Sequence, residues 1–232
     1  MKMPLNITRH IDVFSPDDFG ARRVDVIGVG ASGSRVVLSL AKLGIENIHV
    51  WDDDVVEAHN VPNQVFGLDD VGKLKVDALK AIVLRQTGIE ITTHAERVDG
   101  KQVLGEVVFL LTDTMSSRKQ IWNGGIKYKA RTKLMIETRM GSDQGYVYII
   151  NPTAPAQVRG WEAASDYGDE VAEVSACGTS ISVGPTAEFL SGLAVWQLIR
   201  WFAGVQKKGD TALENELVFG LRTPTMVGRK FK

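Results

Sequence analysis

The sequence has little cysteine and no excess of either charge. Its single cysteine, Cys177, excludes an internal disulfide framework and any zinc site made of several cysteines, so no zinc is expected. Lys and Arg number 27 against 28 Asp and Glu, and this balance argues against a general nucleic-acid-binding protein. No run approaches the ~20 apolar residues of a membrane span, and the N-terminal residues lack the apolar core of a signal peptide. We therefore expect a soluble cytoplasmic protein with no membrane partner.

The sequence instead contains short apolar strands that alternate with helices. Its 232 residues, 44% of them hydrophobic, suit one large domain over 1–232 without a second core. Strands are predicted at 23–29, 46–51, 90–98, 106–111, 132–138, 146–150 and 217–221. Helices are predicted from the glycine at 33 to Leu43, after an N-cap at Asp70, over 114–128 and over 184–202. This alternation predicts an α/β fold with a Rossmann-like, mostly parallel sheet flanked by helices.

Two segments break the alternation. Residues 151–176 contain two prolines and an acidic cluster, and we expect an irregular crossover loop there. Residues 205–232 form a C-terminal extension in which only the strand at 217–221 is expected. The basic tail that begins at Gly228 is expected to fray.

The first predicted strand runs directly into a glycine-rich turn. Gly28, Gly30 and Gly33 fit the G-x-G-x-x-G pattern, after a strand and at the start of a helix. Such a turn lets backbone N–H groups and the helix dipole face a phosphate. Asp52 ends the next strand, near the offset at which an acid accepts hydrogen bonds from ribose hydroxyls. The pattern predicts a nucleotide site but leaves NAD, FAD, S-adenosylmethionine and ATP open, and the glycines could serve close packing alone.

Further short motifs occur in a fixed order. They are D-D-D at 52–54, N-V-P-N-Q at 60–64, G-K-L-K at 72–75 and T-D-T at 112–114. This series resembles the D-x-D, N-L-x-R-Q, G-x-x-K and T-D-N motifs of the ThiF/MoeB family, the adenylyltransferases that activate ubiquitin-like and sulfur-carrier proteins. The resemblance extends from about Arg9 to about Gly204. It implies the adenylation-domain fold of that family, with ATP and Mg²⁺ as cofactors.

The resemblance places the nucleoside part of ATP over the glycine turn. Gly28 and Gly30 would approach the nucleotide, and Gly33 completes the turn. Asp52 would bind the ribose, and Asp54 occupies the second acidic position of the D-x-D motif. In isolation, these two aspartates could simply end a strand and cap the adjoining turn.

The phosphates are expected near Asn60, Asn63, Gln64 and Lys75. A lysine charge there would offset the charge that grows on the α-phosphate and on the leaving pyrophosphate. Asp113 would hold Mg²⁺ shared with the phosphates. Without the resemblance, Lys75 could be an exposed charge on its helix, and Asp113 could belong to a helix cap.

The N-terminus carries an indication of quaternary structure. The segment T-R-H-I at 8–11 resembles the family's R-Q-I element, whose arginine reaches the ATP of the neighbouring subunit. The resemblance implies a homodimer in which Arg9 acts as an arginine finger in trans. A disordered N-terminal arginine would have the same local sequence.

The chain departs from the family pattern in two places. Asn63 stands where N-L-x-R-Q has its arginine, which removes a cation expected to face the triphosphate. Either another cation compensates, with Arg9, Arg118 and Arg139 as candidates, or activity is reduced. The paired C-x-x-C zinc motifs of many members are also absent.

Cys177 lies in S-A-C-G-T, eight residues before Pro185. ThiF-like sequences carry a loop cysteine at this offset, which links covalently to the C-terminus of the carrier protein after adenylation. A thiolate suits that step because it is strongly nucleophilic. The alternative is a small buried cysteine with a packing role only.

Together these features predict an adenylyltransferase that activates the C-terminal carboxylate of a ubiquitin-like or sulfur-carrier protein, with or without later transfer to Cys177. Residues 151–176 are expected to clamp the carrier's flexible tail. Three alternatives remain at this stage. They are a non-catalytic adaptor in which Asn63 marks a weakened site, a family member that acts on tRNA or a small molecule, and an NAD-dependent oxidoreductase.

Overall fold

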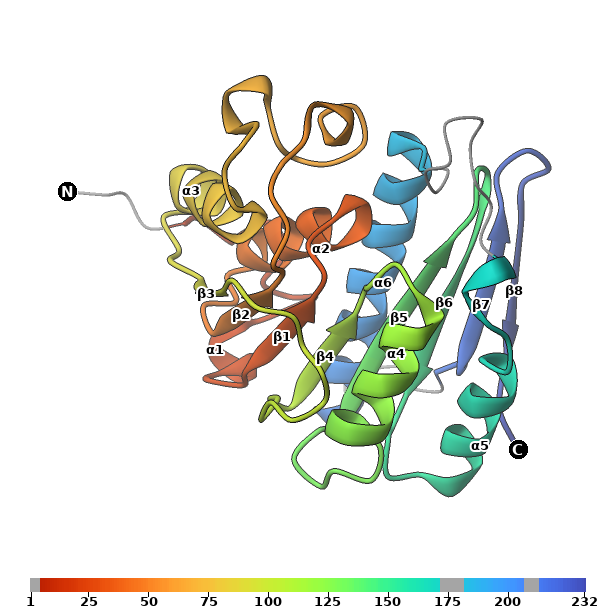
Figure 1. Ribbon diagram of the computed structural model, residues 1–232. Coiled ribbons are helices and arrows are strands. Elements are labelled where there is room, and N and C mark those ends of the chain that lie inside the picture. The colour runs from red at the N-terminus through yellow and green to blue at the C-terminus, as the bar shows by residue number, and fades with distance from the viewer. Residues whose placement is uncertain (1–4, 172–181, 207–212) are drawn as a thin grey trace.

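The computed structural model describes residues 5–171, 182–206 and 213–232. Within these residues, one eight-stranded sheet has the order β3-β2-β1-β4-β5-β6-β7-β8 (Figure 1). The strands are β1 Val24–Ile27, β2 Ile48–Trp51, β3 Thr92–His94, β4 Val107–Leu110, β5 Leu134–Met140, β6 Gln144–Ile150, β7 Glu216–Gly220 and β8 Thr225–Arg229. The first five strands pair in parallel, and β6 to β8 are added antiparallel. The predicted Rossmann-like, mostly parallel α/β sheet with flanking helices is confirmed.

Helices cover both faces of the sheet. The α-helices are α1 Pro16–Phe19, α2 Ala31–Lys42, α3 Lys75–Thr87, α4 Met115–Ile121, α5 Pro155–Ala164 and α6 Gly184–Val205. Short turns of helix are η1 Ala58–Asn60, η2 Leu68–Asp70, η3 Trp122–Ile126 and η4 Asp169–Val171. Helices α2, α3 and α6 lie on one face, and α4 and α5 lie on the other (Figure 1).

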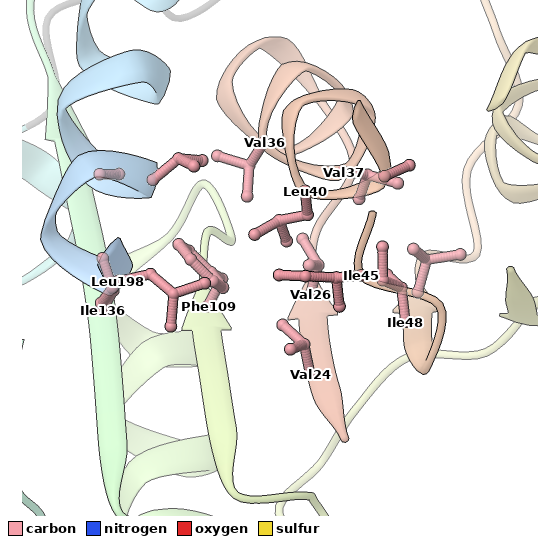
Figure 2. Close-up of a cluster of buried hydrophobic side chains, with 14 of the residues drawn as sticks. Val24, Val26, Val36, Val37, Leu40, Ile45, Ile48, Phe109, Ile136 and Leu198 are labelled. Carbon is pink, nitrogen blue, oxygen red and sulfur yellow. The ribbon is translucent and has the colours of Figure 1, made fainter. Parts of the chain in front are cut away.

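The larger core lies between the sheet and the layer that contains α2 and α6. Figure 2 shows Val26 of β1 and Phe109 of β4 facing Leu40 of α2, with Leu198 of α6 beside them. The central strands β1 and β4 are buried throughout, as expected for parallel strands covered on both faces. The part of the chain that the structure describes contains no helix with both the length and the hydrophobicity of a membrane span.

Three local predictions were wrong. Residues 151–176 are not irregular throughout, because α5 begins at Pro155, which takes the N-terminal helical position that proline tolerates. The tail is not frayed from Gly228, because β8 continues to Arg229 and pairs with β7. Helix α3 begins at Lys75 instead of after an N-cap at Asp70, since Gly72 adopts a left-handed conformation with φ +89°.

The sheet order creates a topological switch point at the carboxyl ends of β1 and β4, and this position is called the crevice below. These strands are neighbours, with Ile27 opposite Leu110, yet the helices that come after them, α2 and α4, lie on opposite faces of the sheet. Ligands of open α/β sheets bind at such a switch point, beyond the carboxyl ends of the strands. The residues that form this edge are therefore the candidates for a functional site.

Candidate functional site

The turn after β1 needs two of its glycines for steric reasons. Gly28 has φ +86°, and a Cβ atom there would lie 2.7 Å from the carbonyl oxygen of Leu111. A Cβ atom on Gly33 would lie 1.9 Å from the carbonyl oxygen of Gly28. The turn is thus pressed between the end of β4 and the start of α2. The packing interpretation of these glycines is therefore confirmed, and their role in binding a nucleotide stays a prediction.

The N-terminus of α2 is open toward the crevice edge. Gly30 is its N-cap and provides no side-chain hydrogen bond, and the first turn has no acidic residue. The first backbone N–H groups of a helix have no partner within the helix. They and the helix dipole make a favourable position for an anion such as a phosphate.

Asp52 connects the end of β2 to the glycine turn. Its Oδ2 accepts a 2.8 Å hydrogen bond from the N–H of Val29, and its Oδ1 accepts one of 2.9 Å from the N–H of Asp54. Burial raises the pKa of Asp52, against the opposing effects of the Val29 hydrogen bond and the charge of Lys75. A carboxylate has about four lone-pair positions, so Asp52 can still accept hydrogen bonds from a ligand.

Lys75 is the first residue of α3 and is only 7% exposed. Its Nζ donates a 2.7 Å hydrogen bond to Oδ2 of Asp54, and its backbone N–H donates to the carbonyl oxygen of Asp54. The interpretation of Lys75 as an exposed helix charge is therefore wrong. Lys75, Asp54 and Asp52 form one charged cluster beside the glycine turn.

The segment 60–64 folds over the glycine turn. Asn60 is buried, and its Oδ1 accepts a hydrogen bond from the N–H of Glu57. Its carbonyl oxygen accepts hydrogen bonds from the N–H groups of Asn63 and Gln64. The amide nitrogen of Gln64 lies 4.0 Å from the position of a Cβ on Gly30. Asn60 therefore shapes this segment, and Gln64 reaches the turn.

Three side-chain oxygens around the turn are buried without a hydrogen-bond partner in the described chain. They are Oδ1 of Asn63, Oε1 of Gln64 and Oγ1 of Thr112. Buried polar atoms are nearly always paired in folded proteins, so each exception calls for an explanation. A polar ligand with both donors and acceptors would pair them, and a nucleotide has both.

Asp113 lies after β4 at the same edge of the sheet. The N–H of Leu111 donates to the carbonyl oxygen of Ile27, which holds the start of this loop beside β1. Asp113 itself is exposed, and no described residue forms a hydrogen bond or an ion pair with its carboxylate. The carboxylates of residues 52–54 lie within 4.8 Å of one another, but one oxygen of Asp54 is already bound by Lys75.

Arg118 and Arg139 are both bound to one buried acid. Glu137 is fully buried and accepts hydrogen bonds from Arg118 (3.0 Å), from Arg139 (2.7 Å) and from the indole N–H of Trp161 (2.7 Å). Burial opposes ionisation of Glu137, but the two arginines outweigh it and lower its pKa. Arg118 also donates to the carbonyl oxygen of Thr112 at 2.8 Å. Both arginines are thus already paired with a carboxylate. A sign of this pairing is present in the sequence, because Glu137 and Arg139 are two charged residues on the same face of an otherwise apolar strand.

Arg9, by contrast, is not brought to this crevice within the chain. Arg9 is exposed, and Ile7 in the same segment lies 3.6 Å from the Cβ position of Gly44, beyond the C-terminal end of α2. The glycine turn is at the other end of that helix, about 18 Å away at 1.5 Å per residue. Cys177 lies outside the described residues.

One cation near the crevice was missed by sequence reasoning. Arg35 of α2 donates through Nη1 to the carbonyl oxygens of Ala31 and Asn63. Its pKa is lowered by burial, with the charge of Glu188 acting in the opposite direction. An arginine in an amphipathic helix is normally interpreted as an exposed charge, and only the fold places it beside the segment 60–64.

Comparison with known proteins identifies the family of this chain. The ThiF family matches residues 9–227. The NEDD8-activating enzyme E1 catalytic subunit of Arabidopsis thaliana is 34% identical over 105 residues, 43% of this chain and 23% of that protein. The sulfur carrier protein ThiS adenylyltransferase of Escherichia coli is 23% identical over 194 residues, 79% of this chain and 73% of that protein. The chain thus spans under a quarter of the Arabidopsis relative.

The fold is also shared with a solved structure. The structure of Escherichia coli MccB with ATP superposes with a TM-score of 0.69 at 18% identity. The superposition covers 93% of this chain and 66% of MccB. This likeness concerns the arrangement of the sheet and its helices.

Proposed function

This chain belongs to the ThiF family, and on that basis we propose that it is an ATP-dependent adenylyltransferase that activates the C-terminal carboxylate of a ubiquitin-like or sulfur-carrier protein. The observation that carries the proposal is the set of unpartnered, buried oxygens of Asn63, Gln64 and Thr112 around the glycine turn. A nucleotide would bring donors and acceptors to these atoms. The relatives named above include a ThiS adenylyltransferase, which supports this reaction class.

The residues present suit ATP. Asp52 would accept hydrogen bonds from the ribose, as its carboxylate is fixed by two backbone N–H groups. The open N-terminus of α2 would face the phosphates. Lys75, whose Nζ is held by Asp54, would lie beside them. The side-chain amide of Gln64, which lies near Gly30, can pair with the nucleotide through either end.

The proposed reaction is an in-line displacement at the α-phosphorus. A carboxylate oxygen of the carrier's C-terminus forms a bond to the α-phosphorus, the bond to the β-phosphate oxygen breaks, and pyrophosphate leaves. The product is an acyl-adenylate. The protein contributes alignment and charge stabilisation, with Lys75 offsetting the charge that grows on the transferred and leaving phosphates.

Asp113 is the residue we propose for Mg²⁺. Its exposed carboxylate, which no described residue binds, provides the hard oxygen ligand that this ion prefers. Magnesium bound there would neutralise phosphate charge and help the pyrophosphate leave. Arg118 would position Asp113 indirectly, because it anchors the carbonyl oxygen of Thr112.

We also propose a homodimer in which Arg9 acts in the partner's site. Gly184, at the start of α6, lies near Asn63, while Phe202 near its end packs on Phe14. The outer face of α6 carries Phe189 and Trp196, which are 46% and 51% exposed. Two α6 helices packed antiparallel about a two-fold axis would cover this face. They would also bring the N-terminal segment of each chain to the crevice of the other.

The segment after α5 supports a role in holding the carrier's tail. Asp169 accepts hydrogen bonds from the N–H (3.0 Å) and the Oγ (2.6 Å) of Ser116, and Lys119 donates to the carbonyl oxygen of Tyr167. The last described residues of this segment therefore lie beside α4. We propose that residues 151–176 contribute to the tail clamp. We also propose that the thiol of Cys177 attacks the acyl carbon of the adenylate, so that the bond to the phosphate oxygen breaks, AMP leaves and a thioester forms.

A second function, a non-catalytic adaptor, is favoured by one observation. Asn63 removes the family's arginine from the segment over the glycine turn. ATP–pyrophosphate exchange separates the two functions. Exchange that requires an added carrier protein ending in Gly-Gly supports the adenylyltransferase, and a folded protein without exchange supports the adaptor.

A further inference from the structure

Arg35 lies where three parts of the crevice edge meet. Long side chains of a helix point toward its N-terminus, so Arg35 in the second turn of α2 reaches back beside the first turn. Its Nη1 donates to the carbonyl oxygen of Ala31 at 2.9 Å and to that of Asn63 at 2.5 Å. Its Nη2 lies 3.7 Å from the Cβ position of Gly184. The guanidinium thus joins α2, the segment 60–64 and the start of α6.

The charge of Arg35 is not neutralised by a contact in the described chain. Arg118 and Arg139 each form an ion pair with Glu137, whereas no described carboxylate lies within ion-pair distance of Arg35. Burial lowers its pKa, and Glu188 acts only at longer range to raise it. A half-buried cation without a paired anion is unfavourable. Such a cation is expected where the protein binds an anionic ligand.

The unpaired hydrogen-bond donors of Arg35 have the geometry that binds a phosphate group. Nη1 is used by the two carbonyl oxygens, while Nε and Nη2 have no partner among the described residues. Nε and Nη2 form one edge of the planar guanidinium and can donate two parallel hydrogen bonds to one phosphate group. The open N-terminus of α2 lies one turn of helix away.

We propose that Arg35 binds the triphosphate chain of ATP and replaces the arginine that the family pattern has at the position of Asn63. The proposal rests on the ATP site proposed above. Asn63 keeps a part in this arrangement, since its backbone carbonyl oxygen fixes the guanidinium. In the family pattern the cation is on the segment over the glycine turn, whereas in this chain it is on α2, the helix beneath that segment. The loss at position 63 is therefore compensated from a neighbouring element.

A purely structural role for Arg35 makes a different prediction. If Arg35 served only to tie α2 to the segment 60–64, Arg35→Gln would lose little, because glutamine can still donate to a carbonyl oxygen. If Arg35 binds phosphate, Arg35→Gln and Arg35→Ala lose the charge equally. Both variants should then weaken binding of ATP and spare binding of AMP, which lacks the β- and γ-phosphates.

Isothermal titration with MgATP and with AMP tests the proposal. We expect Arg35→Gln to weaken ATP binding by roughly ten- to a hundredfold, the range for a charged hydrogen-bonded group. AMP affinity should change less than about twofold, and melting should show that the variant is folded. Arg85→Ala, which removes an exposed arginine in the last turn of α3, is the matched control and should bind ATP like wild type.

A rescue variant provides the second arm. Arg35→Ala combined with Asn63→Arg returns a guanidinium to the family's position and should recover most of the lost ATP affinity. Unchanged ATP affinity in Arg35→Gln, an equal loss for ATP and AMP, or a double variant as weak as Arg35→Ala would overturn the proposal. A wild-type protein that binds no ATP would instead overturn the proposed function itself.

Discussion

The ammonium group of Lys75 lies 2.7 Å from Oδ2 of Asp54, and the two side chains differ greatly in exposure. The side chain of Lys75 is 9% exposed, whereas that of Asp54 is 66% exposed. The lysine is thus fixed by the fold at the start of α3, while its partner faces solvent. A phosphate that enters the crevice could share Lys75 with Asp54 at little cost, because an exposed carboxylate is readily rehydrated.

Loss of Lys75 is expected to abolish most adenylation. Lys75→Ala should lower carrier-dependent ATP–pyrophosphate exchange by about 10²- to 10³-fold, the usual effect of removing one group that stabilises developing charge. Lys80→Ala is the matched control, because Lys80 is on the same helix and forms an exposed ion pair with Glu90. Equal exchange rates in the two variants would show that Lys75 has no role in the reaction.

Asp113 is expected to govern the magnesium requirement. Asp113→Ala should lose exchange at low millimolar Mg²⁺, because a carboxylate ligand of the ion is removed. Asp113→Asn, which keeps one oxygen ligand, should regain part of the rate as the Mg²⁺ concentration is raised. A magnesium titration of both variants measures this. An unchanged titration curve would contradict the assignment.

Arg9 is expected to work only across a dimer. Arg9→Ala and Lys75→Ala proteins should each be nearly inactive alone. When they are mixed and allowed to exchange subunits, mixed dimers contain one intact site, so activity should return to about a quarter of wild type. Arg22→Ala is the control, because Arg22 pairs with Glu106 within the chain, and this variant should be active without a second protein. No recovery from a verified mixed dimer would contradict action in trans.

Cys177 is expected to act after adenylation. Cys177→Ala should retain exchange at the wild-type rate, because the thiol attacks the acyl-adenylate only once pyrophosphate has left. The same variant should form no thiol-sensitive conjugate with the carrier on a non-reducing gel. Loss of exchange in a folded Cys177→Ala protein would argue against a separate, later role.

Glu137 is expected to contribute strongly to stability. Glu137→Gln leaves Arg118 and Arg139 without their buried partner, and such a loss costs about 3–5 kcal/mol. Glu162→Gln, which breaks the more exposed pair with Lys127, should cost no more than about 1 kcal/mol. Urea unfolding at neutral pH measures both values. Similar costs for the two variants would contradict the buried network.

The pH dependence of the Glu137 contribution is determined by its lowered pKa. A group with a lower pKa in the folded state stabilises the fold fully above its unfolded pKa, about 4.3 for glutamate. That stability is lost as the pH falls through the folded value. The stability difference between wild type and Glu137→Gln should therefore be constant from about pH 5 to 8 and shrink below about pH 4.

The sequence predicted those parts of the fold that depend on local pattern. The buried strands that end at Ile27 and Leu110 and the glycine turn are visible as apolar runs and special residues. Sequence could not show that β1 and β4 are neighbours, because strand order depends on packing between distant segments. It also missed α5, because Pro155 was counted among the features of an irregular loop although proline is favoured at the first helical position.

The sequence predicted the site residues that belong to motifs. It missed the residues whose role depends only on their surroundings in the fold. The structure places Asp52, Lys75 and Gln64 around one turn, and their roles there remain predictions. Arg35 and Glu137 belong to no motif, and their importance comes from what surrounds them. The charge of Arg35 lacks a counter-ion among the described residues, and Glu137 is enclosed by two arginines and Trp161.

The most direct test of the central claim is radiolabelled pyrophosphate exchange into ATP, measured with purified protein and small β-grasp proteins that end in Gly-Gly from the same organism. We expect exchange that depends on one such carrier and on Mg²⁺, and that is lost in Lys75→Ala but retained in Lys80→Ala. A folded protein that binds ATP yet gives no exchange with any of these carriers would contradict the claim.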